Sequence, residues 1–76
     1  MRSRVKEVIA RVLEVDVGEV PDSARVGDLP GWDSLRQLEL ALELEREFQV
    51  RIPTESMLEL TSLDAIEKFL SRAAPT

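Results

Sequence analysis

The sequence predicts an all-α fold, a four-helix bundle with a long loop between the first and second helices and a short third helix. Two observations lead to this class. Apolar residues recur at helical spacing in several segments, and a stretch rich in glycine, proline and aspartate separates the first two of them. The 76 residues are expected to form a single domain, 1–76, with room for one core and little for an enclosed active site.

The first helix is expected at about residues 3–15. Apolar side chains recur there at i, i+3, i+4, i+7 and i+8, namely Val5, Val8, Ile9, Val12 and Leu13. This spacing places them on one face, which predicts an amphipathic helix that packs against the core.

Residues 16–33 are expected to form a long loop. Turn-forming and helix-breaking residues follow one another in this segment: Gly18, Pro21, Gly27, Pro30 and Gly31. A loop of this length in so small a domain is usually either functional or disordered. Three apolar side chains are expected to hold it against the core, namely Val20, Val26 and Leu29.

The second helix is expected at residues 34–48. Ser34 is a suitable N-cap, and Gln37 three residues later completes the pattern of a capping box. Asp33 places a negative charge beside the same helix end, where the helix dipole favours it. Leucine and glutamate, both strong helix formers, dominate the segment, and Pro53 limits its extension.

Two shorter helices complete the predicted bundle. A third helix is expected at 54–60, opened by Thr54, and a fourth at 62–73, capped by Thr61 or Ser62. The fourth has apolar side chains at helical spacing: Leu63, Ile66, Phe69 and Leu70.

The second helix carries two apolar stripes on nearly opposite sides. A small bundle has one core, and we assign to it Leu40, Leu44 and Phe48. The other stripe is then at least partly exposed and consists of Leu35, Leu38 and Leu42. An exposed apolar stripe rimmed by charge is typical of a docking surface. The alternative is that the loop 16–33 folds over this stripe and buries it.

Composition excludes several classes of function. The chain contains no cysteine and no histidine, so disulfides, thiolate nucleophiles, imidazole acid–base chemistry and the usual zinc ligands are absent. We therefore expect a carrier or binding role, with no enzyme activity and no metal site. The loop acids Asp16, Glu19, Asp22, Asp28 and Asp33 raise the alternative of a calcium site, but their spacing does not match an EF-hand.

The net charge of −5 is concentrated in the middle of the chain, where acidic side chains exceed basic ones by six over residues 16–48. Such a segment repels nucleic-acid phosphates and attracts basic partner surfaces. No apolar run approaches the roughly 20 residues that span a membrane. We expect a cytoplasmic monomer that binds neither nucleic acid nor membrane.

Ser34 lies where the long loop meets a helix N-terminus. The free backbone N–H groups at such an end favour an anion such as a phosphodiester, and a hydroxyl there is accessible to modification. Taken alone, the tripeptide Asp33-Ser34-Leu35 indicates no more than a helix cap.

The wider sequence resembles the acyl carrier protein family, the domains to which phosphopantetheine is attached. The resemblance rests on several motifs in consistent order: Leu29-Pro30-Gly31-Trp32-Asp33-Ser34-Leu35, then Glu39-Leu40, Leu44-Glu45-Arg46-Glu47-Phe48, Ile52-Pro53 and Thr61-Ser62-Leu63. It extends from Val5 to Leu70. The expected fold is therefore that of an acyl carrier protein.

The resemblance implies that Ser34 receives 4′-phosphopantetheine from coenzyme A through a separate magnesium-dependent phosphopantetheinyl transferase. The thiol of the arm would carry acyl groups as thioesters, and Asp33 would help the transferase to position metal or serine. Partner enzymes of ligase, ketosynthase or acyltransferase type would contact Leu35, Leu38 and Leu42. The expected charged contacts to such partners are Arg36, Glu39, Glu43 and Glu45.

Two residues depart from the pattern of a housekeeping fatty-acid carrier. Arg36 stands where an acid is usual, and Trp32 where a small residue is common. Both favour a carrier of specialised biosynthesis, such as polyketide, nonribosomal-peptide or other pathways. The expected role is to present acyl intermediates to enzymes of fatty-acid, polyketide or related specialised biosynthesis, and an aminoacyl or peptidyl carrier stays open. A helical protein–protein interaction domain with an unmodified Ser34 is the alternative outside the family.

The resemblance also raises an acyl-chain site between the second and third helices. The residues near it are Leu44, Ile52, Leu58, Leu60 and Leu63. From the sequence we favour ordinary core packing for these side chains.

Overall fold

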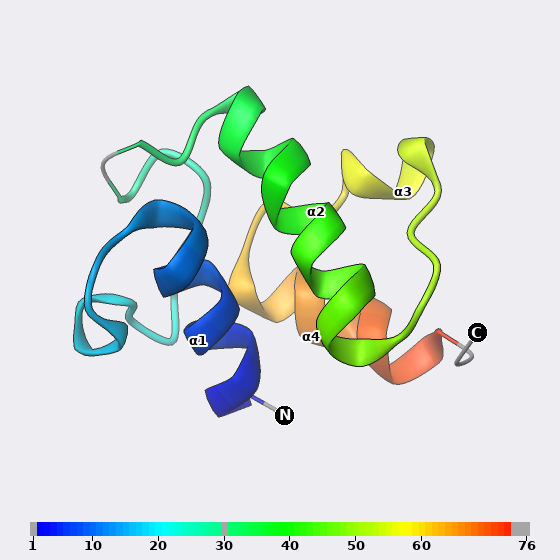
Figure 1. The fold of residues 1–76 in the computed structure, drawn as a ribbon, viewed down its shortest axis with the longest axis horizontal. Coiled ribbons are helices and arrows are strands. Elements are labelled where there is room, and N and C mark those ends of the chain that lie inside the picture. Colours follow the sequence, from blue (N-terminus) through cyan, green and yellow to red (C-terminus); the bar gives the residue numbers. More distant parts are fainter. Residues whose placement is uncertain (1, 30, 74–76) are drawn as a thin grey trace.

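The computed structural model describes residues 2–29 and 31–73 and confirms the all-α class. The element order is α1 (Arg2–Leu13), η1 (Val17–Glu19), α2 (Ser34–Phe48), α3 (Thr54–Met57) and α4 (Leu63–Arg72). Helix α1 packs against α2 and α4, while the short α3 lies along the other side of α2 (Figure 1). The long loop between α1 and α2 contains the single 3₁₀ turn η1, which the sequence analysis did not predict.

Helices α1 and α2 both end without glycine. Glu14 and Gln49 adopt positive φ angles of 58° and 52° just beyond the two helices. The next amide then bonds back over the helix end, from Val15 N to Ala10 O at 3.0 Å and from Val50 N to Glu45 O at 3.3 Å. These bonds are those of a Schellman ending, which explains why α1 stops two residues before its predicted end.

The two C-terminal helices are shorter than predicted. Helix α3 ends at Met57 rather than at residue 60, because tight i→i+3 bonds follow it, from Glu59 N to Ser56 O and from Leu60 N to Met57 O. Of the two predicted caps for α4, Ser62 is the one used, and its Oγ accepts from Ala65 N at 3.1 Å.

The core forms where α1, α2 and α4 meet. As predicted, the apolar face of α1 is buried, and so are Leu40, Leu44, Leu63, Ile66 and Leu70, whereas Phe48 and Phe69 are only partly buried. Leu44, Ile52, Leu60 and Leu63 are buried in this core, but Leu58 is 74% exposed. Leu58 therefore faces solvent and does not contribute to the core.

Opposite charges join α1 to α2. Arg4 lies 3.2 Å from the Glu47 carboxylate, and its guanidinium stacks over the Phe48 ring at 4.5 Å from the centroid. Arg11 lies 3.8 Å from Glu43 and 3.7 Å from Glu47. Part of the acidic charge of α2 is therefore used within the molecule.

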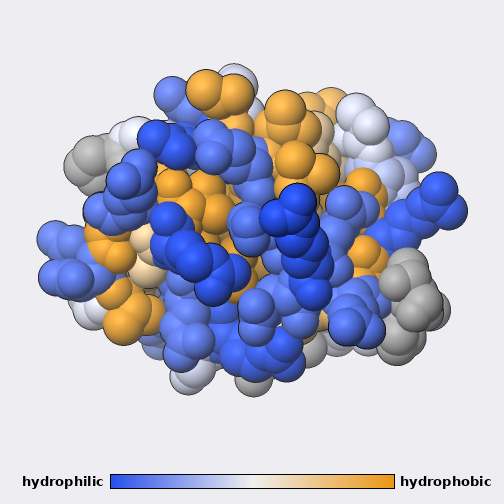
Figure 2. Space-filling view, viewed as in Figure 1, coloured by the Kyte–Doolittle hydropathy of each residue, from blue (hydrophilic) through white to orange (hydrophobic). Residues whose placement is uncertain are grey.

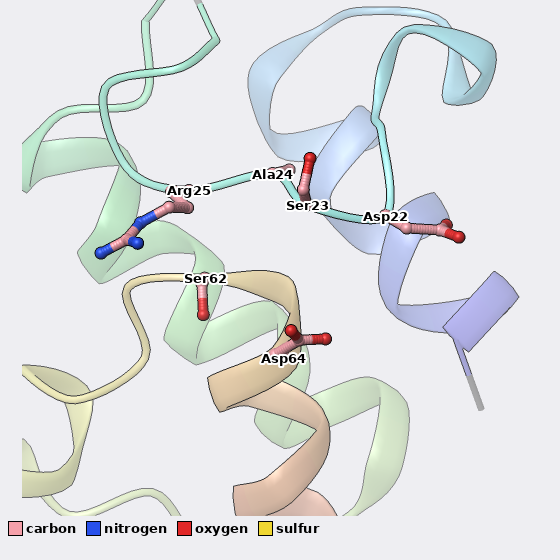
Figure 3. A pocket seen from close by; sticks show the side chains of 6 residues that line it. All are labelled: Asp22, Ser23, Ala24, Arg25, Ser62 and Asp64. Atoms are coloured by element: carbon pink, nitrogen blue, oxygen red, sulfur yellow. The ribbon is translucent and has the colours of Figure 1, made fainter.

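The loop between α1 and α2 is anchored to the start of α4 by backbone pairing. Val26 N donates to Thr61 O at 2.8 Å, and Leu63 N donates to Ala24 O at 3.0 Å. Figure 3 shows this stretch of loop beside the residues that open α4, around a cavity of about 170 Å³. Of the predicted anchors, Val20 is buried, but Val26 is 39% exposed, so its assignment to the core was wrong.

The buried residues of the loop are instead Val20, Ala24 and Trp32. Ala24 is fully buried because the backbone pairing brings it directly against α4. Trp32 is only 3% exposed, and Leu29 packs against the core in a partly buried position.

A cluster centred on Arg2 joins α1, the loop and α4. Arg2 bonds to Glu67 and to Asp64 and lies 3.6 Å from Asp22, which also pairs with Lys6. The ammonium of Lys6 lowers the pKa of Asp22, and the guanidinium of Arg2 lowers the pKa of Glu67. Asp22 and Asp64 are exposed and the other three side chains are partly exposed, so solvent screens their pairing.

Candidate functional site

Asp33, not Ser34, is the N-cap of α2. Asp33 Oδ1 accepts a hydrogen bond from Arg36 N at 3.0 Å, and Asp33 has the extended backbone of a cap, with φ −117° and ψ −168°. The prediction that Ser34 caps the helix was therefore wrong. Ser34 is the first helical residue and is exposed. Because the neighbouring carboxylate serves as the cap, the Ser34 hydroxyl is available for chemistry.

The predicted capping box was also wrong, because the Gln37 side chain turns away from the N-cap. Gln37 Oε1 accepts from Trp32 Nε1 at 2.8 Å. Gln37 Nε2 donates to Met57 O at 3.2 Å and to Leu60 O. The side chain thus connects the segment before Ser34 with the end of α3.

A groove of about 200 Å³ opens beside Ser34. It lies between the N-terminal turn of α2, the end of α3 and the loop, and its lining residues are Val26, Asp33, Ser34, Gln37, Met57, Leu58 and Thr61. Ser34 and Asp33 therefore stand at the edge of a largely apolar depression. Sequence analysis did not assign Val26 and Met57 to this site, because their positions depend on contacts between distant segments.

The second apolar stripe of α2 is uncovered. Leu35 is 64% exposed, Leu38 45% and Leu42 50%, so the loop does not fold over them. Figure 2 shows hydrophobic side chains along the upper edge of the molecule, where Figure 1 places the first turns of α2. Leu58, the residue after α3, is also exposed and lines the groove beside Ser34.

The charged residues predicted to accompany this stripe differ in their surroundings. Arg36 lies 3.2 Å from Glu39 and 3.6 Å from Glu14. Glu43 faces Arg11 and Arg46, and Glu45 accepts a hydrogen bond from Ile52 N at 2.8 Å. Arg36, Glu43 and Glu45 therefore all contact residues outside α2, whereas Glu39 forms its ion pair with Arg36 on the same helix.

The site offers a free hydroxyl rather than catalytic machinery. Throughout residues 2–29 and 31–73, acidic side chains nowhere form a cluster of three that could hold a metal ion. The carboxylate of Asp33 is occupied by the Arg36 amide. An exposed serine of this kind is suited to accept a covalent group that a separate enzyme transfers to it.

No helix in the described part of the chain has the length and apolar character needed to cross a membrane.

Comparison with known proteins agrees with this geometry. The family model described as "phosphopantetheine attachment site" matches residues 3–70. The chain belongs to the acyl carrier protein family. Members of this family carry a covalently bound 4′-phosphopantetheine and are carriers, not enzymes. Their role implies partner enzymes that load and process the carried group.

Two curated proteins that the chain resembles differ greatly in length. The chain is 34% identical over 70 residues to the polyketide-8 synthase acyl carrier protein 2 of Streptomyces avermitilis. This alignment covers 92% of this chain and 80% of that protein. It is 27% identical over 73 residues to a non-reducing polyketide synthase of Emericella nidulans. That alignment covers 96% of this chain but only 3% of the synthase.

Proposed function

We propose that Ser34 is the attachment residue for 4′-phosphopantetheine and that this carrier serves polyketide or related specialised biosynthesis. The observation that carries the proposal is the exposed Ser34 hydroxyl at the start of α2, released from capping by Asp33 and beside an apolar groove. The arm supplies the thiol that the cysteine-free chain lacks, and acyl groups are carried on it as thioesters.

The helix end also suits the bond that would form. Transfer joins the hydroxyl oxygen of Ser34 to the phosphorus that bears the pantetheine arm and breaks the pyrophosphate bond of coenzyme A. The adenosine bisphosphate half leaves with the electron pair of that bond, the hydroxyl proton is released, and a singly charged phosphodiester remains on Ser34. The amide groups of Ser34 and Leu35 belong to the first turn of α2, where no preceding turn supplies acceptors. Their N–H groups and the helix dipole favour the negative charge of a phosphodiester at this position.

The proposed partners are a phosphopantetheinyl transferase and enzymes of ligase, ketosynthase or acyltransferase type. The surface that would meet them is the stripe of Leu35, Leu38 and Leu42, with Arg36 and Glu39 at its edge. Exposed apolar side chains supply contact area, while rim charges set the encounter rate and partner choice. That Glu43 and Glu45 take part in docking stays a prediction. The cytoplasmic location also stays a prediction.

Both relatives are named as polyketide proteins, which supports a polyketide pathway over an aminoacyl or peptidyl one. Arg36 and Trp32, the two departures from a housekeeping carrier, support specialised biosynthesis but do not distinguish these two pathways. The single domain over residues 1–76 also belongs to the proposal.

Intact mass tests the attachment site. The protein is incubated with coenzyme A, magnesium and a broad-specificity phosphopantetheinyl transferase, beside Ser34→Ala and the matched control Ser23→Ala, which removes another exposed loop hydroxyl. We expect a gain of about 340 Da in the natural protein and in Ser23→Ala, and none in Ser34→Ala. A gain in Ser34→Ala, or no gain in folded, unmodified natural protein, would contradict the proposal.

A further inference from the structure

The Gln37 side chain on α2 forms hydrogen bonds to the loop before Ser34 and to the α3 region. Its amide oxygen accepts the indole N–H of Trp32, in the loop just before Ser34. Its amide nitrogen donates to the carbonyl group of Met57, the last residue of α3, and to that of Leu60, three residues beyond it. We call this arrangement of Trp32, Gln37 and the two carbonyl groups the Gln37 bridge.

The bridge has only one workable orientation. The indole nitrogen can only donate and the carbonyl oxygens can only accept, so the Gln37 amide must point its oxygen at Trp32 and its NH₂ group at α3. Because Trp32 is 3% exposed, its N–H would lose a partner if Gln37 turned away. The buried tryptophan therefore orients the side chain that holds α3.

Helix α3 is short and only partly buried. It contains only four residues, none of them fully buried, and a helix that short is not stable by itself. Its packing partner is α2, and Leu58 at its end is 74% exposed. Met57 also packs against the core, and Leu60, three residues beyond α3, is buried, so the hydrogen bonds from Gln37 act together with this packing to fix the end of α3 beside the groove.

We propose that Gln37 is a positioning residue that sets the separation of α3 from the N-terminal turn of α2, and thereby the width of the groove beside Ser34. Loss of its bonds frees α3 locally while the three longer helices stay folded. Ser34 and Gln37 line the same groove. The bridge therefore also shapes the protein surface beside which an arm attached to Ser34 would lie. Only this last consequence rests on the proposed function.

Amide hydrogen exchange of the unmodified protein tests the bridge without any partner enzyme. The amides of Ser56, Met57, Glu59 and Leu60 are hydrogen-bonded within the α3 region and report its opening. We expect Gln37→Met to speed their exchange by about fivefold or more, while the slowest amides of α1 and α4 are much less affected. Because no transferase is used, this test can fail while Ser34 is still modified, and the reverse.

Two further variants separate the halves of the bridge. Gln37→Glu keeps an acceptor for the indole but loses both N–H donors, so it should free α3 with little change in the emission of Trp32, the single tryptophan. Trp32→Phe removes the indole N–H and should also speed α3 exchange. Thr61→Val is the matched control, since it alters the same groove without touching the bridge.

Three results would overturn the inference. The first is unchanged α3 exchange in both Gln37 variants, and the second is equal acceleration in Thr61→Val. The third is loss of protection in all helices together, because a merely structural role for Gln37 would lower the stability of the whole domain rather than that of α3.

Discussion

Asp33 has two possible roles, and two substitutions separate them. Its carboxylate caps α2 by accepting from Arg36 N at 3.0 Å, and it also stands next to the proposed attachment residue. Asp33→Ala removes the cap and the charge together. Asp33→Asn keeps a side-chain oxygen for the cap and removes only the charge, because asparagine caps helices about as well as aspartate.

The expected loss of stability follows from these contacts. Losing an N-cap costs about 1 kcal/mol, and losing a negative charge at a helix N-terminus about 0.3–1 kcal/mol more. Asp33→Ala should therefore lose about 1–2 kcal/mol, which in a domain of this size lowers the melting temperature by about 5–15 °C. Asp33→Asn should lose only the charge contribution, less than half of that total.

Thermal and urea unfolding followed by circular dichroism measure these differences, and intact mass measures the rate of phosphopantetheine transfer. If the carboxylate itself assists the transferase, both variants should be modified slowly, although only Asp33→Ala is strongly destabilised. If Asp33 acts only as a cap, Asp33→Asn should be modified normally. An Asp33→Ala variant as stable as the natural protein would refute the assignment of the cap.

Three further outcomes are expected. Leu44→Ala should lose about 2–5 kcal/mol in urea unfolding, because the fully buried side chain leaves a cavity in the core, and a loss below 1 kcal/mol would contradict its packing. Leu35→Ser should raise the KM of the transferase for this protein with unfolding unchanged, since the side chain is 64% exposed, and an unchanged KM would remove it from the docking surface. Arg2→Gln should move acid unfolding to higher pH. The lowered pKa of Glu67 gives stability above its ordinary value of 4.5 that is lost as the pH falls through the folded-state value, and removing Arg2 returns that pKa toward normal. An unshifted acid transition, measured by circular dichroism, would count against the role of Arg2.

The fold class was predictable because periodicity is a local property of the sequence. Regular apolar spacing in α1 and α4, and the Leu/Glu-rich run of α2, indicate helices without reference to the rest of the chain. Whether Leu35, Leu38 and Leu42 are exposed could not be decided from the sequence, because the path of the loop 16–33 could either cover them or leave them uncovered. That path depends on the pairing of Ala24 and Val26 with residues 61–63, which no local pattern announces.

The position of Ser34 was predictable, but its immediate bonding was not. Asp33 and Ser34 are both good caps and are adjacent, so composition does not decide which residue takes the extended backbone of the N-cap. Gln37 was assigned to the capping box because of its spacing, yet the buried Trp32 indole requires an acceptor and takes its amide oxygen. Long-range partners therefore determined the details that local rules left open.

The pairing of the loop with the start of α4 makes the order of synthesis relevant to this site. The backbone groups of Ala24 and Val26 are hydrogen-bonded to Leu63 and Thr61. The loop that leads to Ser34 therefore reaches its final conformation only after residues 61–63 have been synthesised. A fragment cut before residue 63 would keep Ser34 and every neighbour in sequence, yet lose the support that places them. Any excised or fused form of this carrier therefore needs α4 for its serine to be presented as described.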